Sequence, residues 1–151
     1  MLCLTSISVS DRSNDAPLTA APAKPRIVIA DDHNRMLEEV SRLLTRKFEV
    51  VAAVENGALA VHRVTDLKPD VVVLDIHMPM MGGIEAAREL IRQGSSAKII
   101  FLTIETDPEY VGLATAMGAS YVIKAHIHDL ITAIDEGFET QTIVSKSLTL
   151  D

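Results

Sequence analysis

Polar side chains follow four apolar runs of this sequence directly. Asp31 and Asp32 come after RIVIA, Asp75 after DVVVL, Thr103 after KIIFL and Lys124 after SYVI. If these runs are parallel strands of one sheet, their carboxyl ends meet at one edge, where open α/β proteins place their functional groups. The sequence therefore predicts a single site that contains three carboxylates, one hydroxyl and one ammonium.

Such a site suits a divalent cation and a phosphoryl group. Neighbouring carboxylates repel one another and destabilise the fold unless positive charge offsets them. Lys124 can offset one charge, and Mg²⁺ is the expected cation because it binds carboxylates together with phosphate oxygens. The peptide carbonyl of His77 could complete the metal shell. Asp75 could accept a phosphoryl group as a nucleophile, with the Thr103 hydroxyl donating to one of its oxygens.

Each of these residues also has an ordinary structural explanation. Either carboxylate after RIVIA could cap the helix that follows. Thr103 could be a plain strand-end residue, and Lys124 could be a solvated charge. Their occurrence together at four of five strand ends favours the functional interpretation. The fifth run, EVVAAV, ends in Glu55–Gly57, which we interpret as an ordinary loop beside a peripheral strand.

The elements that must position these groups alternate between strand and helix over about residues 26–140. The five strand candidates are β-branched and apolar almost throughout, which is typical of a parallel sheet covered on both faces. Apolar residues at helical spacing lie between them, as in 36–44 and 127–138. Asp107-Pro108 predicts a helix start, and Gly94 and Gly118 predict helix ends. Right-handed crossovers then give an open doubly wound α/β sheet.

Composition limits the classes of protein that are possible. The chain has 151 residues, 48% of them apolar, which is enough for one well-packed domain. A net charge of −7 argues against a nucleic-acid-binding surface within this chain. One cysteine excludes an internal disulfide. No apolar run is long enough for a membrane span and no signal peptide is recognisable, so we expect a cytoplasmic protein.

The two ends of the chain differ from its centre. Residues 1–25 are rich in Ser, Ala, Pro and Asp, and we expect a disordered leader there. We expect residues 141–151 to be a tail, because a DNA-reading helix-turn-helix domain needs far more chain than this. The sequence is then a natural stand-alone domain or a fragment of a longer protein, and the long leader favours the first.

The ordered part resembles a known family. The matching segments are IVIADDHNRML, FEVVAAVENGALAV, PDVVVLDIHMPMMGGIEA, IIFLT, DPEYV and GASYVIK, over about residues 26–135. They resemble the receiver domain of bacterial two-component response regulators, with the LuxR/NarL-type subfamily nearest. The resemblance implies a flavodoxin-like (βα)5 fold with five parallel strands in the order 2-1-3-4-5.

The resemblance also implies roles for the site residues. Asp75 would be the phosphoacceptor, Asp31 and Asp32 would hold Mg²⁺, and Lys124 would pair with Asp75 and then with the acyl phosphate. The phosphoryl donor would be a histidine kinase or a phosphotransfer protein.

Two further residues would then form the switch. Thr103 would move toward the phosphoryl group, and Tyr121 would change its rotamer with it. The surface that responds would comprise the fourth helix, the fifth strand and the fifth helix, about residues 107–138. That surface would control a downstream partner, and it or the first and fifth helices could form a homodimer.

Some positions depart from the commonest receiver pattern. Ile104 is bulky where a small residue is common, so it could restrict access to Asp75. Gly82 stands where many relatives carry aspartate, a change that we interpret as harmless. His77 and Glu105 occupy positions that face the attacking water, and we expect them to tune dephosphorylation.

Two other functions are compatible with parts of this sequence. A phosphorylation-independent interaction module would keep the receiver scaffold alone, and the bulky Ile104 is compatible with it. A magnesium-dependent phosphohydrolase would need an aspartate two residues after Asp75 as general acid, and His77 stands there. We therefore expect a signalling domain rather than an enzyme.

Overall fold

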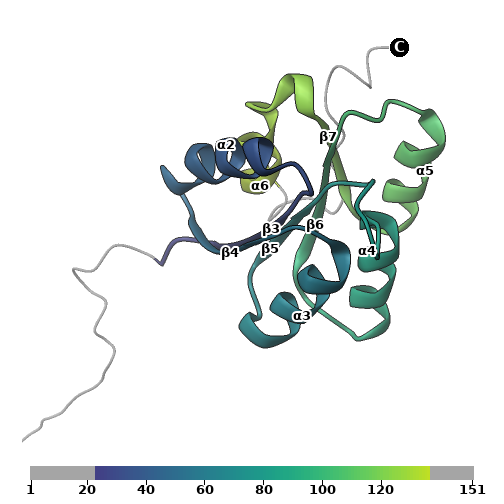
Figure 1. Ribbon diagram of the computed structural model, residues 1–151, viewed down its shortest axis with the longest axis horizontal. Helices are drawn as coiled ribbons and strands as arrows, with labels where there is room; N and C mark the ends of the chain where they lie inside the picture. Colours follow the sequence, from purple (N-terminus) through teal and green to yellow (C-terminus); the bar gives the residue numbers. More distant parts are fainter. Residues whose placement is uncertain (1–22, 137–151) are drawn as a thin grey trace, which may run out of the picture.

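The computed structural model describes residues 23–136, and its five strands form one parallel sheet (Figure 1). The strands are β3 (Arg26–Ala30), β4 (Glu49–Val54), β5 (Val71–Leu74), β6 (Lys98–Thr103) and β7 (Ser120–Ile123). They lie in the order β4-β3-β5-β6-β7, which is 2-1-3-4-5 in chain order. The predicted flavodoxin-like topology is thereby confirmed.

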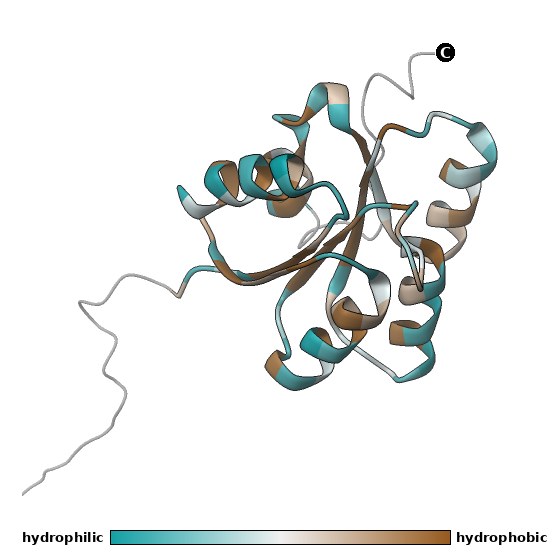
Figure 2. Cartoon of the chain, in the orientation of Figure 1, coloured by the Kyte–Doolittle hydropathy of each residue, from teal (hydrophilic) through white to brown (hydrophobic). Residues whose placement is uncertain are grey.

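Helices cover both faces of this sheet (Figure 1). They are α2 (Asn34–Thr45), α3 (Gly57–Leu67), α4 (Gly83–Arg92), α5 (Pro108–Ala116) and α6 (Asp129–Glu136), with a 3₁₀ turn η1 (Lys124–His126) before α6. One core cluster packs α2 and α6 against one face of the sheet, and a second packs α3, α4 and α5 against the other. The strands therefore bury apolar side chains on both faces, and Figure 2 shows them coloured mostly as hydrophobic. All four residues of β5 are buried.

The helix boundaries lie at the capping residue and the glycines that the sequence predicts. The Asp107 side chain accepts a hydrogen bond from the backbone of Glu109 and so caps α5, which begins at Pro108. Gly94 and Gly118 follow α4 and α5 in the left-handed conformation that glycine adopts readily, with φ of 79° and 73°. These predicted boundaries are confirmed. Phe138, the last residue of the predicted apolar stripe, lies outside the described residues.

The described helices are too short or too polar for a bilayer. Among residues 23–136 none reaches the length and hydropathy of a membrane-spanning segment.

Candidate functional site

Asp31 and Asp75 are held at the same edge of the sheet by their own main chains. The N–H of Asp31 donates to the carbonyl of Val54 at 3.0 Å, and the N–H of Asp75 donates to the carbonyl of Ala30 at 3.0 Å. Both residues therefore continue the strand ladder beyond β3 and β5. Their side chains are buried, with 3% and 5% exposure. This arrangement fixes two carboxylates close together with little access to water.

Lys124 connects these two carboxylates. It follows β7, and its Nζ lies 2.8 Å from an Asp31 oxygen and 3.1 Å from an Asp75 oxygen. Its side chain is only 7% exposed. Burial alone would lower the pKa of Lys124, but contact with the two carboxylates outweighs it and raises the pKa. The ammonium therefore stays charged.

The charge of Asp75 is only partly compensated by its neighbours. Burial raises the pKa of its carboxyl, and the neighbouring Asp31 raises it further. Lys124 lowers the pKa but does not cancel those effects. The folded protein therefore holds Asp75 in a place where its negative charge is under-compensated. A further cation or an incoming electrophile would relieve that charge.

Asp32 lies at the mouth of the site beside His33. Its side chain is 31% exposed, and its oxygen lies 3.1 Å from His33 Nδ1. Asp31 accepts the main-chain N–H of His33 at 2.9 Å. Because α2 begins at Asn34 with His33 as its N-cap residue, the explanation of the acidic pair as the helix cap is wrong. Both carboxylates face the site instead.

The donor set fits a hard divalent cation. One ligand atom each from Asp31, Asp32, Asp75 and His33 can be chosen so that all lie within 4.8 Å of one another. Three of these atoms are carboxylate oxygens, the ligands that Mg²⁺ prefers. Lys124 contributes one positive charge against three carboxylates, so the cluster keeps a negative excess that suits a cation.

Thr103 and Tyr121 meet at the loop that follows β6. Thr103 ends β6 with no exposed surface, and its Oγ1 accepts the N–H of Glu105 at 3.2 Å. Tyr121 in β7 is also fully buried, and its hydroxyl donates to the Glu105 carbonyl at 2.6 Å. Burial and the nearby Glu105 raise the pKa of Tyr121, so the hydroxyl remains a donor. The two predicted switch residues thus share one neighbour.

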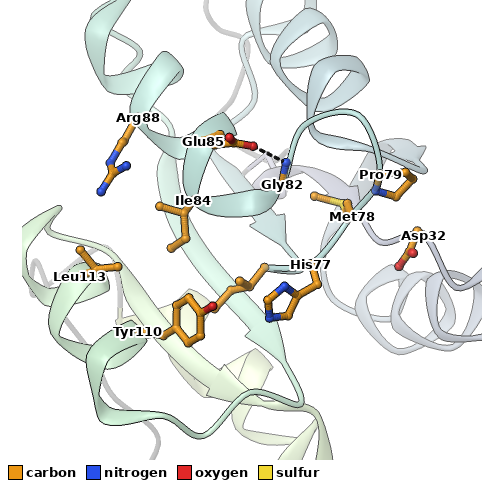
Figure 3. A pocket seen from close by; sticks show the side chains of 11 residues that line it. Asp32, His77, Met78, Pro79, Gly82, Ile84, Glu85, Arg88, Tyr110 and Leu113 are labelled. Carbon is orange, nitrogen blue, oxygen red and sulfur yellow. Dashed lines mark hydrogen bonds between the residues drawn. The ribbon is translucent and has the colours of Figure 1, made fainter.

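His77 lies across the entrance from that loop. Its Nε2 is 3.1 Å from a carboxylate oxygen of Glu105. Its ring also meets the ring of Tyr110 edge-on, with centroids 5.7 Å apart and planes at 89°; Figure 3 shows the two rings side by side. These contacts join positions far apart in the chain, so no local sequence pattern indicated them.

Asp75 lines a cavity whose wall combines apolar side chains with charged and polar ones. This cavity of about 360 Å³ is lined by Asp75, Lys124 and His77 together with Met36 and Ile104. Ile104 is 75% exposed, so it stands at the rim of this cavity rather than inside the core. A second hollow of about 640 Å³ lies between α4 and α5 on the other side of His77 (Figure 3).

Two glycine positions shape the loop after β5. The N–H of Gly57 donates to the carbonyl of Met81 at 2.8 Å, so the loop after β4 supports the loop after β5. The interpretation of Glu55–Gly57 as an ordinary loop missed this contact. Gly82 is the N-cap residue of α4, and its N–H donates to the Glu85 carboxylate at 2.9 Å (Figure 3). A Cβ at Gly82 would lie 2.8 Å from the Ile76 carbonyl. Gly82 is therefore more than a harmless replacement, because a side chain there would force a shift.

Fold and site together define a flavodoxin-like α/β domain with an acidic cluster at the carboxyl edge of its sheet. The sequence model of the response regulator receiver domain matches residues 27–135. The chain belongs to this family, the receiver domains of two-component systems.

Individual relatives agree with this assignment. The chain is 43% identical over 104 residues to the transcriptional regulatory protein DegU of Brevibacillus brevis, covering 67% of this chain and 44% of DegU. It is 32% identical over 127 residues to the response regulator GacA of Pseudomonas viridiflava, covering 82% of this chain and 59% of GacA. The chain thus spans about half the length of these curated relatives.

Solved structures of LuxR-family regulators share the fold. A DNA-binding response regulator from Staphylococcus aureus superposes with a TM-score of 0.71 at 30% identity, over 74% of this chain and 97% of that one. A two-component response regulator from Aurantimonas sp. SI85-9A1 superposes with a TM-score of 0.79 at 30% identity, over 85% of this chain and 94% of that one.

Proposed function

We propose that Asp75 accepts a phosphoryl group from a phosphohistidine of a histidine kinase or a phosphotransfer protein, with Mg²⁺ as cofactor. The observation that carries this proposal is the Lys124 ammonium between Asp31 and Asp75, 2.8 and 3.1 Å from their oxygens. A buried carboxylate with incomplete charge compensation at a rigid strand end is suited to attack an electrophilic phosphorus.

The site residues divide the work of this transfer. Asp31, Asp32, Asp75 and the main-chain carbonyl of His77 would hold Mg²⁺. When bound, the ion would supply positive charge for the oxygens of the transferred group.

The remaining steps belong to side chains that the sheet positions. The ionised carboxylate of Asp75 forms a bond to phosphorus through one oxygen as the bond from phosphorus to the donor nitrogen breaks, and that nitrogen stays on the donor histidine with the electron pair. Lys124 pairs with a phosphoryl oxygen, and the Thr103 hydroxyl donates to another. Because Lys124 starts between two carboxylates, it needs only a small displacement to follow the new charge.

Phosphorylation of Asp75 would change the surface that binds a downstream partner. Movement of Thr103 toward the phosphoryl group draws the loop after β6 inward and repositions Tyr121 with it. The surface of α5, β7 and α6 then changes its affinity for a downstream protein or an output domain. A homodimer through that surface, or through α2 and α6, is part of this proposal, as is a cytoplasmic location.

Intact mass spectrometry tests the proposal. After incubation with acetyl phosphate and Mg²⁺, we expect a gain of about 80 daltons that requires the metal and is lost on standing. Asp75→Asn should abolish the gain. Asp66→Asn, which changes an exposed carboxylate of α3 beside His62, is the matched control and should retain it. Undiminished uptake by Asp75→Asn would refute the assignment of the phosphoacceptor.

A phosphorylation-independent interaction module is the second candidate, and the apolar rim formed by Met36 and Ile104 favours it. It predicts that neither acetyl phosphate nor a phosphorylated donor protein modifies the chain. Opening the rim with Ile104→Ala separates the two functions, because uptake that appears only in this variant would show a shielded phosphoacceptor. A phosphohydrolase is disfavoured, because His77 replaces the required second aspartate.

A further inference from the structure

Glu105 touches three elements of the site through three different polar groups. Its carboxylate lies 3.1 Å from Nε2 of His77, its N–H donates to Thr103 Oγ1 at 3.2 Å, and its carbonyl accepts the Tyr121 hydroxyl at 2.6 Å. The carboxylate contacts His77 in the loop after β5, whereas the two main-chain groups contact the proposed switch residues, Thr103 and Tyr121. A displacement of the Glu105 side chain therefore acts on both switch residues through its own backbone.

The segment that carries Glu105 is otherwise held by the two main-chain hydrogen bonds of Glu105 and by Asp107, which caps α5. Residues 104–107 lie between β6 and α5 and belong to no helix or strand. Ile104 in this segment is largely exposed. The bond to His77 ties this segment to the loop after β5, which the other bonds do not do. Because the two side chains are 60% and 32% exposed, the contact can open into water without leaving a buried charge unpaired.

We propose that His77 and Glu105 form a latch that fixes the resting position of residues 104–107, and through them the buried position of Tyr121. Glu105 is a positioning residue in this scheme. His77 lies two residues after Asp75, so an event at the phosphoacceptor reaches the latch directly. This last link rests on the proposed phosphorylation of Asp75, whereas the resting latch does not.

The tyrosines of this chain make the latch measurable. The chain has two, Tyr110 and Tyr121, and they lie at opposite ends of the latch. Tyr110 meets the His77 ring (Figure 3), while Tyr121 bonds to the Glu105 carbonyl. Protein labelled with 3-fluorotyrosine should give one ¹⁹F resonance for each. Tyr110→Phe and Tyr121→Phe assign them.

The decisive variant is His77→Ala in the unphosphorylated full chain. It removes a ring beside Tyr110, so the Tyr110 resonance moves in any case. The Tyr121 resonance moves only if the restraint passes through Glu105. We expect the displaced population of Tyr121 to rise about three- to tenfold, as for loss of one partly exposed hydrogen bond. Glu105→Ala should do the same.

Matched variants separate the latch from general loosening. Glu105→Gln keeps an acceptor for the His77 ring and should restore the wild-type Tyr121 resonance. His62→Ala removes another exposed histidine–carboxylate pair, with Asp66 at 3.2 Å on α3, and should leave both resonances in place. An unchanged Tyr121 resonance in His77→Ala would overturn the proposal. His77 is exposed enough for that variant to fold, so the test does not depend on Glu105→Ala.

The latch and the phosphoryl switch fail in different ways. Intact mass and ¹⁹F spectra of the same sample, recorded with acetyl phosphate and Mg²⁺, report uptake and the response of Tyr121 together. Absence of uptake from any donor would refute the proposed function and leave the resting-state result standing. Uptake with an undiminished Tyr121 response in His77→Ala would show that the latch plays no part in transmission.

Discussion

Gly83 packs directly against the main chain of Asp75. A Cβ placed on Gly83 would stand 2.0 Å from the Asp75 carbonyl oxygen, a separation that no real side chain reaches. The first turn of α4 and the end of β5 are therefore in contact only because residue 83 lacks a side chain. The geometry of the proposed phosphoacceptor thus depends on a residue that takes no part in the proposed transfer.

We expect Gly83→Ala to destabilise the domain by about 2–3 kcal/mol and to slow phosphoryl uptake, because the methyl group must push Asp75 from its place. Urea unfolding and timed intact mass measure the two effects. Gly112→Ala is the matched control: it lies in α5, and within residues 23–136 a methyl group there would meet open space. It should be stabilising by about 0.5–1 kcal/mol, owing to helix propensity. Equal stability of the Gly83→Ala variant and the wild type would contradict the packing argument.

Asp75→Asn should stabilise the domain although it removes the proposed nucleophile. The substitution relieves the charge that burial and Asp31 make costly, while the amide oxygen can still accept from Lys124. We expect a gain of about 1 kcal/mol at neutral pH, in the range typical of functional-site replacements. Thermal unfolding without Mg²⁺ measures it, and a loss of stability would show that the ion pair outweighs the repulsion.

The gain from Asp75→Asn should depend on pH. Since folding raises the pKa of Asp75 above 3.8, the folded state binds the proton more tightly than the unfolded state. Protonation of Asp75 therefore adds to the folding stability of the wild type at acid pH. This added stability is lost as the pH rises from about 4 through the raised pKa. The stability difference between variant and wild type should grow over that interval and then level off. Urea titrations at several pH values would reveal a flat difference if the pKa were unshifted.

Lys124→Met should be strongly destabilising. The substitution keeps the length of the side chain but leaves two buried carboxylates without their cation, and we expect a loss of about 3 kcal/mol. Lys47→Met is the matched control, because Lys47, in the turn after α2, pairs with Asp135 of α6 at 2.7 Å in an exposed position. That loss should stay below about 1 kcal/mol. Similar losses for both variants, in the same urea experiment, would mean that the Lys124 pair contributes no more than a surface contact.

Several features of the fold and the site could be predicted from the sequence. Apolar runs that are β-branched throughout indicate strands buried on both faces, and parallel strands place their carboxyl ends at one edge. The convergence of Asp31, Asp75 and Lys124 follows from that rule, without any knowledge of distances. The helix caps at Asp107, Gly94 and Gly118 could also be predicted from the sequence, because they depend on local backbone chemistry alone.

The contacts that tune the site could not be predicted in this way. Gly57 supports the Met81 carbonyl, and Glu105 meets His77, across intervals of chain that carry no periodic signal. Loops contribute such contacts, and their paths depend on how the helices pack rather than on local propensity. For the same reason the sequence does not indicate that Gly82 and Glu55–Gly57 shape the loop after β5.

The sequence by itself determined the order of the elements, the edge of the sheet where the polar groups gather and the identity of those groups, since these depend on local pattern and parallel topology. Only the tertiary structure decided that one ammonium serves both Asp31 and Asp75, and that Glu105 connects His77 with Tyr121. Distances of a few ångströms between distant residues arise from the packing of the whole domain, which no segment of the chain specifies alone.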